Sequence, residues 1–174
     1  MPASAPATSG LDPAFLDEFA HRWMAAWNAH DAEGLAALCA EDVEFFDPAI
    51  QTIRGRAAVA DWVRKCTSAF PDYRFEEPEP AYAARDAQKG IAPWRMTGTN
   101  SGPLEPPGFA PTGRAVVIEG VDHWWFRDGL VGRYRADYDL SGVLRQLGLA
   151  PQPGSRGERA LVRLQRLGTR LKKP

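Results

Sequence analysis

The stretch RAVVIEGVDHWWFRDGLVGRYRADYD, residues 114–139, decides the expected fold. Two runs rich in β-branched and aromatic residues, 114–126 and 130–139, flank the triplet Arg127-Asp128-Gly129. An Asp-Gly pair between two such runs is a strong hairpin signal, because both residues accept the backbone angles of a tight turn. We therefore predict a long antiparallel hairpin here.

The segments upstream and downstream of this hairpin divide into helices and strands by the period of their apolar residues. The expected strands are 73–84 and 91–99, with a short one at 43–46, and the expected helices are 13–29, a short one capped by Asp31, 55–70 and 141–147. Helices come first and strands later, without alternation. This order predicts an α+β fold with a curved, mostly antiparallel sheet.

The two ends of the chain differ from its body in composition. The 174 residues suffice for one domain, which we place at 11–150. Residues 1–10 are rich in Ala, Pro and Ser and predict a disordered head. Residues 151–174 form a linker and a basic amphipathic tail, in which seven Lys and Arg against Glu158 give +6, so the remainder of a chain with net charge −1 carries −7. Such a tail suits an anionic membrane, an acidic partner, its own body or a dimer partner.

Composition argues against several functional classes. No apolar run approaches the roughly 20 residues of a membrane helix, so we expect no membrane span. The head lacks the basic region of a secretory signal. A net charge of −1 disfavours nucleic acid as a partner. Cys39 and Cys66 lack a paired spacing and the three histidines lie far apart, so we expect a cytoplasmic protein with free thiols and no metal site.

Seven short motifs in a fixed order carry a family resemblance. They are 27–31 (WNAHD), 46–48 (FDP), 55–56 (GR), 70–72 (FPD), 94–102 (WRMTGTNSG), 111–114 (PTGR), and 128–129 (DG) leading to 144–148 (LRQLG). Their order and spacing resemble the SnoaL-like polyketide cyclase branch of the nuclear transport factor 2-like superfamily. The resemblance covers about residues 12–149.

The resemblance implies a cone-shaped fold, in which the curved sheet wraps around three N-terminal helices and a hydrophobic pocket. It also implies a homodimer, formed through the outer sheet face, and an enzyme of secondary metabolism that uses no cofactor. In such cyclases a carboxylate on the last strand, a histidine on the preceding strand and a polar residue after the first strand serve an intramolecular aldol closure. By position these catalytic residues are Asp137, His123 and Asp47, although Asp47 departs from the family's His-Asn-Pro-like stretch.

The register of the hairpin decides what surrounds Asp137. With a three-residue turn, Glu119 stands opposite Asp137, and Arg135 and His123 share their face. The facing Glu119 carboxylate would raise the pKa of Asp137, and the adjacent Arg135 would lower it. A carboxyl group between these two influences suits general acid–base catalysis. With a two-residue turn, Asp137 instead joins Asp122. The resemblance favours the first register.

Aromatic side chains are expected to form most of the pocket wall, because ligand sites are mostly apolar with a few placed polar groups. The expected substrate-binding residues are Trp27, Phe46, Trp62, Trp94, Asn100, Glu119 and Arg135. Each assignment has a structural alternative: tryptophans fill cores, Asp47 can shape a turn, and Asp137 can pair with an arginine on a solvated face. The proline-rich loop 102–111 either covers the pocket or simply joins two strands.

We therefore expect a polyketide (ester) cyclase-like enzyme with a carboxylate general acid/base, acting on a small hydrophobic substrate that bears a carbonyl group. An isomerase, a dehydratase or an epoxide-opening cyclase remains open, since Asp47 supplies a second carboxylate. A non-catalytic ligand-binding module is the alternative from another class. Convergence of Asp137 and Asp47 in one cavity would favour an enzyme.

Overall fold

The computed structural model describes residues 10–171, so residues 1–9 of the predicted head lie outside the described part. The helices are α1 (Pro13–Asn28), α2 (Ala32–Ala37), α3 (Arg56–Ala69), α4 (Leu140–Gln146) and α5 (Arg156–Leu171). The strands are β1 (Cys39–Asp47), β2 (Gln51–Arg54), β3 (Arg74–Glu76), β4 (Tyr82–Ala83), β5 (Lys89–Thr99), β6 (Ala115–Arg127) and β7 (Leu130–Tyr138). The predicted α+β class is confirmed.

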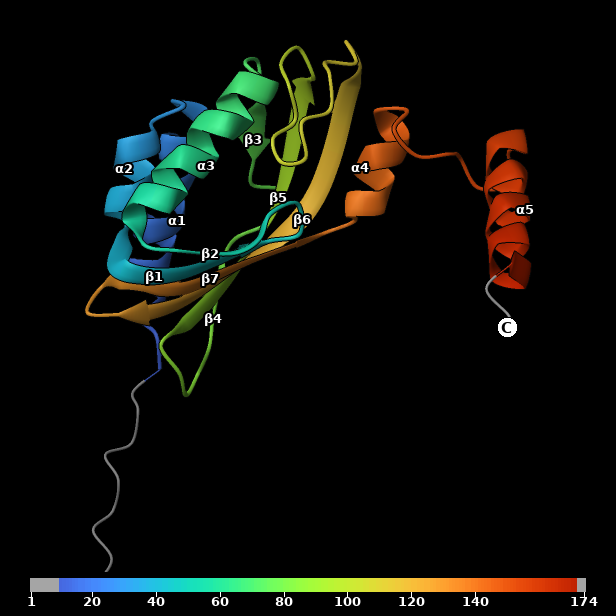
Figure 1. Ribbon diagram of the computed structural model, residues 1–174. Helices are drawn as coiled ribbons and strands as arrows, with labels where there is room; N and C mark the ends of the chain where they lie inside the picture. The colour runs from blue at the N-terminus through green and yellow to red at the C-terminus, as the bar shows by residue number, and fades with distance from the viewer. Residues whose placement is uncertain (1–9, 172–174) are drawn as a thin grey trace, which may run out of the picture.

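The strands form one strongly curved sheet whose concave face holds the first three helices (Figure 1). Its order is β2-β1-β7-β6-β5-β3, with β4 also paired to β5. β1 runs parallel to β7, and the other pairs are antiparallel. The long strands β5, β6 and β7 therefore form most of the sheet, and α2 and α3 contact the neighbouring strand β1.

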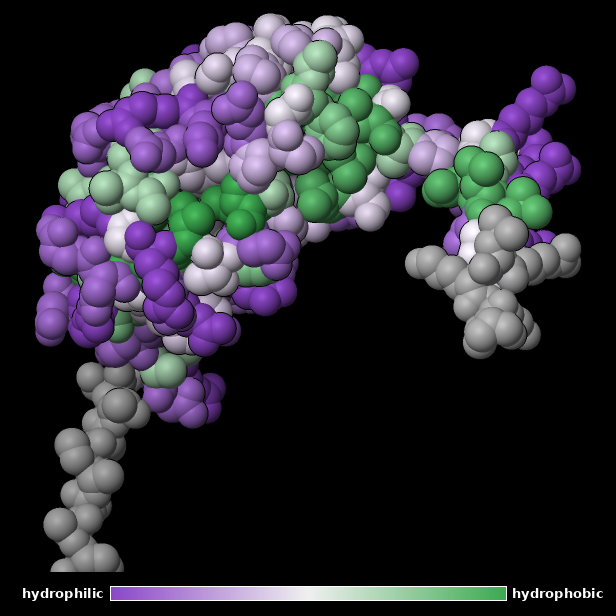
Figure 2. All heavy atoms as spheres, viewed as in Figure 1, coloured by the Kyte–Doolittle hydropathy of each residue, from purple (hydrophilic) through white to green (hydrophobic). Residues whose placement is uncertain are grey.

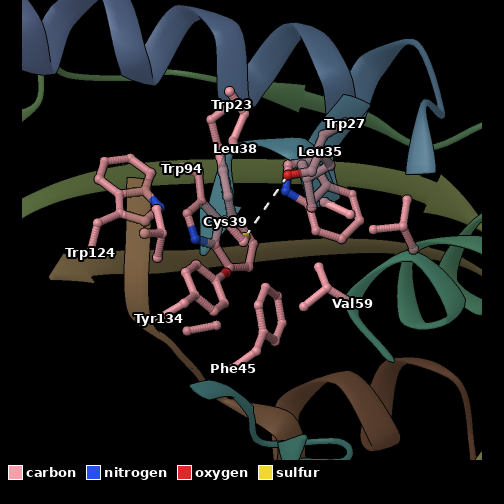
Figure 3. Packing of buried hydrophobic residues seen from close by; sticks show 14 of the residues in the cluster. Trp23, Trp27, Leu35, Leu38, Cys39, Phe45, Val59, Trp94, Trp124 and Tyr134 are labelled. Carbon is pink, nitrogen blue, oxygen red and sulfur yellow. Dashed lines mark hydrogen bonds between the residues drawn. The ribbon is translucent and has the colours of Figure 1, made fainter. Parts of the chain in front are cut away.

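α1 is held on the sheet by a row of large apolar side chains. The helix begins at Asp12, whose carboxylate accepts a hydrogen bond from the Ala14 N–H at 3.0 Å, as expected of an N-cap. Its large buried residues recur at helical spacing and are Leu16, Phe19, Trp23 and Trp27. Figure 3 shows Trp23 and Trp27 among buried residues of the sheet and of α3. Because each such side chain contributes about 1.5–3 kcal/mol on burial, this row fixes α1 over the sheet.

The β6–β7 hairpin combines a two-residue turn with a β-bulge. Asp128 and Gly129 form the turn, with φ angles of 52° and 75°, and Arg127 pairs with Leu130. Two residues further along β7 the register shifts, which leaves Gly132 as the extra residue. The bulge therefore reverses the in-and-out alternation that the turn alone would impose on the rest of β7.

This register corrects the expected cross-strand pairs. The three-residue turn is wrong, and Asp137 lies opposite Val121 instead of Glu119. Glu119 lies opposite Arg95 on the other side, in β5. The alternative that brings Asp137 beside Asp122 is also wrong. The bulge returns Asp137 to the face of Val121 and His123.

Two further differences concern the edges of the sheet. The predicted strand 73–84 is interrupted between β3 and β4, where Pro78 and Pro80 lack the N–H that a ladder requires. The strand β2 was missed, since its four residues are exposed or half-buried at the edge and show no apolar alternation. Both differences concern short strands at the two ends of the strand order, and they leave the pairing of β5, β6 and β7 unchanged.

The C-terminal part holds two helices of different character. α4 begins at Asp139, which accepts a hydrogen bond from the Gly142 N–H at 2.8 Å, as predicted for a cap. α5 stands apart from the sheet beyond α4 (Figure 1). Within residues 10–171, no helix is long and apolar enough to cross a membrane.

Candidate active site

A cavity of about 360 Å³ lies between the concave sheet face and the helices α1, α3 and α4. Ligand pockets span about 300–1,000 Å³, so the volume suits a small molecule. Its wall is mostly apolar and has many aromatic side chains, including Trp23, Trp27, Trp62, Phe70, Tyr73, Phe75, Trp94, Tyr134 and Tyr138. Residues 104–107 and Phe109 of the β5–β6 loop line it as well. The proline-rich loop therefore forms part of the cavity wall.

Asp122, in the middle of β6, is the deepest charged group of this cavity. Its side chain is buried, with 5% of the residue exposed. The Oδ1 atom accepts hydrogen bonds from Trp94 Nε1 and Tyr134 Oη, both at 2.7 Å, and Oδ2 accepts one from Trp23 Nε1 at 3.0 Å. Figure 3 shows these three donors pointing toward one another from α1, β5 and β7. Oδ2 accepts no second hydrogen bond from the described residues.

Burial raises the pKa of Asp122 to about 7, against the three hydrogen bonds that lower it, and the charge of Asp47 adds to the rise. At neutral pH the carboxyl group is therefore poised between its acid and its base form. A protonated Asp122 carries its proton on Oδ2, since Oδ1 already accepts two hydrogen bonds.

A glycine in β6 permits this arrangement. A Cβ atom on Gly120 would lie 2.4 Å from Cζ2 of Trp94, far inside van der Waals contact. Because Gly120 has no side chain, the Trp94 indole packs closely over the strand, and its Nε1 reaches Asp122 two residues further along. A close approach of this kind is one reason for glycine within a strand.

Asp47, at the end of β1, supplies a second carboxyl group to the same cavity. The residue is 9% exposed. Its Oδ1 accepts hydrogen bonds from Tyr138 Oη and the Ala49 N–H, both at 2.8 Å. Burial raises its pKa, and these two bonds act in the opposite direction. The Asp47 side chain thus shapes the turn after β1 and also faces the cavity.

Asp137 lies on the opposite, convex face of the sheet together with His123 and Arg135. His123 Nε2 lies 3.2 Å from Asp137 Oδ2, and Arg135 Nε donates to Asp137 Oδ1 at 2.8 Å. The Arg135 guanidinium holds the pKa of Asp137 below its usual range, and burial together with the nearby Lys89 lowers the pKa of His123. Asp137, His123 and Arg135 do not line the cavity, so of the three expected catalytic residues only Asp47 faces it.

The other expected binding residues divide between the two faces. Trp27, Trp62 and Trp94 line the cavity. Phe46 does not line it and instead lies under the Arg135 guanidinium, 4.7 Å from ring centroid to Cζ. Glu119 lies 3.9 Å from Arg95 on the convex face.

Asn100 is fully buried but supports the wall from behind. Its amide donates to the carbonyls of Ala69 and Gly102 at 3.2 and 2.8 Å, and its Oδ1 accepts from the N–H and Oγ1 of Thr112 at 2.8 and 3.1 Å. Asn100 therefore clamps both ends of the β5–β6 loop to the end of α3.

Sequence reasoning assigned no cavity role to several polar groups that line it, among them Asp122, Tyr134 and Tyr138. One signal was present in β6, where Gly120, Asp122, Trp124 and Phe126 share a face. An acidic residue in such an apolar row is a buried polar group that needs partners. Among the described residues, no cluster of three His, Cys, Asp or Glu side chains could hold a metal ion.

The curved sheet, the three helices on its concave face and the cavity between them define an α+β protein of the nuclear transport factor 2-like class. More specifically, the chain belongs to the SnoaL-like domain family, whose model matches residues 20–134. The family predicted from the sequence is thereby confirmed. Among curated proteins, none matches the chain significantly.

Solved structures share the fold at low sequence identity. TsrD from Streptomyces laurentii has a TM-score of 0.69 at 24% identity, over 80% of this chain and 99% of that chain. AclR from Streptomyces galilaeus, a hydroxylase candidate, has a TM-score of 0.68 at 23% identity, over 80% and 100%. A polyketide cyclase candidate from Pseudomonas putida has a TM-score of 0.65 at 20% identity, over 75% and 96%. These likenesses extend over the body and support the fold alone.

Proposed function

We propose that this protein is an acid–base enzyme that removes a proton from the carbon next to a carbonyl group in a small hydrophobic molecule. One observation carries the proposal: Asp47 and Asp122 are both buried in a single aromatic cavity. Within residues 10–171, neither carboxyl group has an ion pair to hold it permanently ionised. Perturbed carboxyl groups in a cavity are typical of acid–base sites.

The two carboxyl groups take different roles because their environments differ. Asp122 receives three hydrogen bonds and has a pKa near 7, so its protonated form can donate from Oδ2 to a ligand oxygen. A carboxylic acid kept neutral by its surroundings serves as such a donor. Asp47 keeps Oδ2 free of hydrogen bonds from the described residues and serves as the base.

In the proposed step, Asp47 takes the proton as the carbon–hydrogen bond breaks, and the electron pair moves to the carbonyl oxygen. Protonated Asp122 donates a hydrogen bond to the resulting enolate oxygen, where the negative charge develops. The enolate carbon then attacks a second carbonyl group of the same molecule. A carbon–carbon bond forms, and the new alkoxide takes a proton from Asp47. This is the aldol closure of a polyketide cyclase-like reaction, and the chain's own residues suffice for every proton.

The aromatic wall contributes positioning. A flexible chain with two carbonyl groups must fold back on itself before closure, and a tight apolar cavity selects that shape. The proline-rich loop, held by Asn100, shields the cavity, which strengthens the hydrogen bonds to the enolate.

The convex face of the sheet is the surface on which we propose a cytoplasmic homodimer. There Trp125 lies between Lys89 and Arg133, whose charged groups are 4.5 and 4.7 Å from its ring centroid. The cluster of His123, Arg135 and Asp137 would then support subunit contact rather than proton transfer.

The test is hydrogen exchange at a carbon next to a carbonyl group. A two-ring aromatic ketone, 2-tetralone, is incubated with the protein in D₂O, and loss of the acidic protons is followed by proton NMR. We expect saturable exchange well above buffer, and a loss of about 100-fold or more in Asp47→Asn. Fluorescence of the wall tryptophans reports binding separately.

The outcomes separate the enzyme from its alternatives. A ketone that quenches the tryptophans without faster exchange contradicts the enzyme and supports a ligand-binding module. Exchange that is unchanged in Asp47→Asn contradicts the assigned base. Isomerase and dehydratase chemistry shares the enolisation step, so products from a diketone panel distinguish those reactions from ring closure.

A further inference from the structure

Among the described residues, the C-terminal helix α5 carries a group of large apolar side chains that are exposed to solvent. Leu161, Leu164 and Leu167 are 56, 66 and 55% exposed. Every described side chain from residue 161 to residue 169 is exposed. Single exposed leucines are common on protein surfaces, whereas a group of them side by side marks an interaction site. The leucines of α5 form such a group.

The side chains of α5 are sorted into two neighbouring rows. Arg156, Arg159, Arg163 and Arg166 follow the three-and-four spacing that aligns residues along one side of a helix. The leucines occupy the adjoining side. Figure 2 shows the apolar side chains of α5 gathered on one side and the hydrophilic ones on another. The helix therefore presents an apolar strip with a strip of positive charge beside it.

We propose that α5 binds an anionic lipid surface and lies in its plane. The leucines enter the boundary between headgroups and acyl chains, and the arginines beside them pair with lipid phosphates. Charge complementarity selects this occupant: residues 151–174 carry +6, whereas the remainder of the chain carries −7. An anionic surface repels the body and attracts the tail, so α5 alone makes the contact.

Other occupants of α5 fit less well. Pairing with α5 of a second copy would need about three to four heptads for a stable coiled coil, whereas α5 has 16 residues with Gly168 among them. Docking on the chain's own body is not the arrangement seen, since α5 stands apart beyond α4 (Figure 1). Both remain defined outcomes of the test.

The position of α5 next to α4 links the lipid contact to the cavity. α4 lines the cavity with Leu140, Val143 and Leu144, and α5 follows it after residues 147–155. Lipid binding would hold the cavity near the surface in which hydrophobic ketones dissolve. This link rests on the proposed function, whereas the lipid contact does not.

The test is co-sedimentation of the full-length chain with vesicles. One set is pure phosphatidylcholine, and the other contains about one third phosphatidylglycerol as the anionic lipid. We expect binding to the second set only, weakened at high salt because the phosphate contacts are screened. Arg163→Gln with Arg166→Gln should lower the partition coefficient by about 25-fold, at about five-fold for each arginine. The triple variant Leu161→Ser, Leu164→Ser and Leu167→Ser should abolish binding.

The matched control is Arg22→Gln with Arg74→Gln. These two arginines of the body are exposed and have no ion pair with any residue in 10–171, so we expect unchanged vesicle binding. Equal binding to both vesicle sets, or none to either, overturns the proposal. So does concentration-dependent self-association, in analytical ultracentrifugation, that the triple variant removes. Ketone exchange is measured without vesicles, so failure of the proposed function is seen separately.

Discussion

Asp122 and Asp137 belong to the same hairpin, yet they meet opposite physical conditions. Asp122 faces the concave side, where burial raises its pKa to about 7. Asp137 faces the convex side, where Arg135 holds its pKa below the usual range. The comparison teaches that the face of the sheet, more than the strand or the residue type, decides which carboxyl group can move a proton.

The largest expected difference between Asp122 and Asp137 is in how each makes the free energy of unfolding depend on pH. The pKa of Asp122 is higher in the folded than in the unfolded protein, so the folded state binds the extra proton and its stability falls as pH rises from about 4 to 7. The loss from this group is about 4 kcal/mol, at 1.36 kcal/mol for each pKa unit. Urea unfolding across this range should show that Asp122→Asn removes most of the fall.

Asp137→Asn should act in the opposite direction. The folded-state pKa of Asp137 is depressed, so its stabilising contribution is present above its unfolded pKa and is lost on acidification. A variant that loses stability at neutral pH but not at low pH would agree. Equal pH slopes for the two variants would refute the contrast between the faces.

Catalysis should separate the same two residues. Asp122→Asn removes the acid that donates to the enolate oxygen, so we expect ketone exchange to fall about 100-fold, the loss typical of one such donor. Asp137→Asn should stay within about three-fold, because Asp137 lies on the convex face, does not line the cavity and so takes no part in the 10²–10⁴-fold contribution of the acid–base groups. Initial exchange rates at saturating ketone provide the measurement, and a larger loss in Asp137→Asn would move the site to the convex face.

A change in the packing beside the cavity should lower the stability of the fold by a smaller amount. Gly120→Ala places a methyl group against the Trp94 ring, so it should destabilise the fold by about 1–3 kcal/mol, as overpacking does. Gly132→Ala is the matched control, since its Cβ would meet nothing closer than 3.6 Å. Thermal unfolding of both variants checks this, and equal melting temperatures would show that Trp94 moves aside freely.

The smallest effect is expected for Arg135→Gln. The guanidinium is the main cause of the depressed pKa of Asp137, so the pKa should rise toward its ordinary value. A carboxyl ¹³C titration by NMR follows it directly. Ketone exchange should not change, since Arg135 and the cavity lie on opposite faces.

Much of the fold was predictable because its signals are local. The caps at Asp12, Asp31 and Asp139, the helical spacing and the Asp-Gly turn each depend on a few neighbouring residues. Asp47 and three of the four cavity tryptophans, Trp27, Trp62 and Trp94, were also expected from the sequence. The face of Asp122 was not, because it depends on the turn length and on a bulge together. In residues 121–126 both faces carry aromatic and ionisable side chains, so alternation gives no preference.

The bulge at Gly132 decides which face each later residue of β7 occupies: if Gly132 paired with Trp125 in a regular ladder, all of those residues would turn to the other face. Without the bulge, Arg133, Arg135 and Asp137 would turn into the aromatic cavity, and Tyr134, Ala136 and Tyr138 would turn out. Regular pairing in place of the bulge would thus exchange two complete sets of side chains. The strand encodes two alternative linings, and a single glycine selects which of them is used.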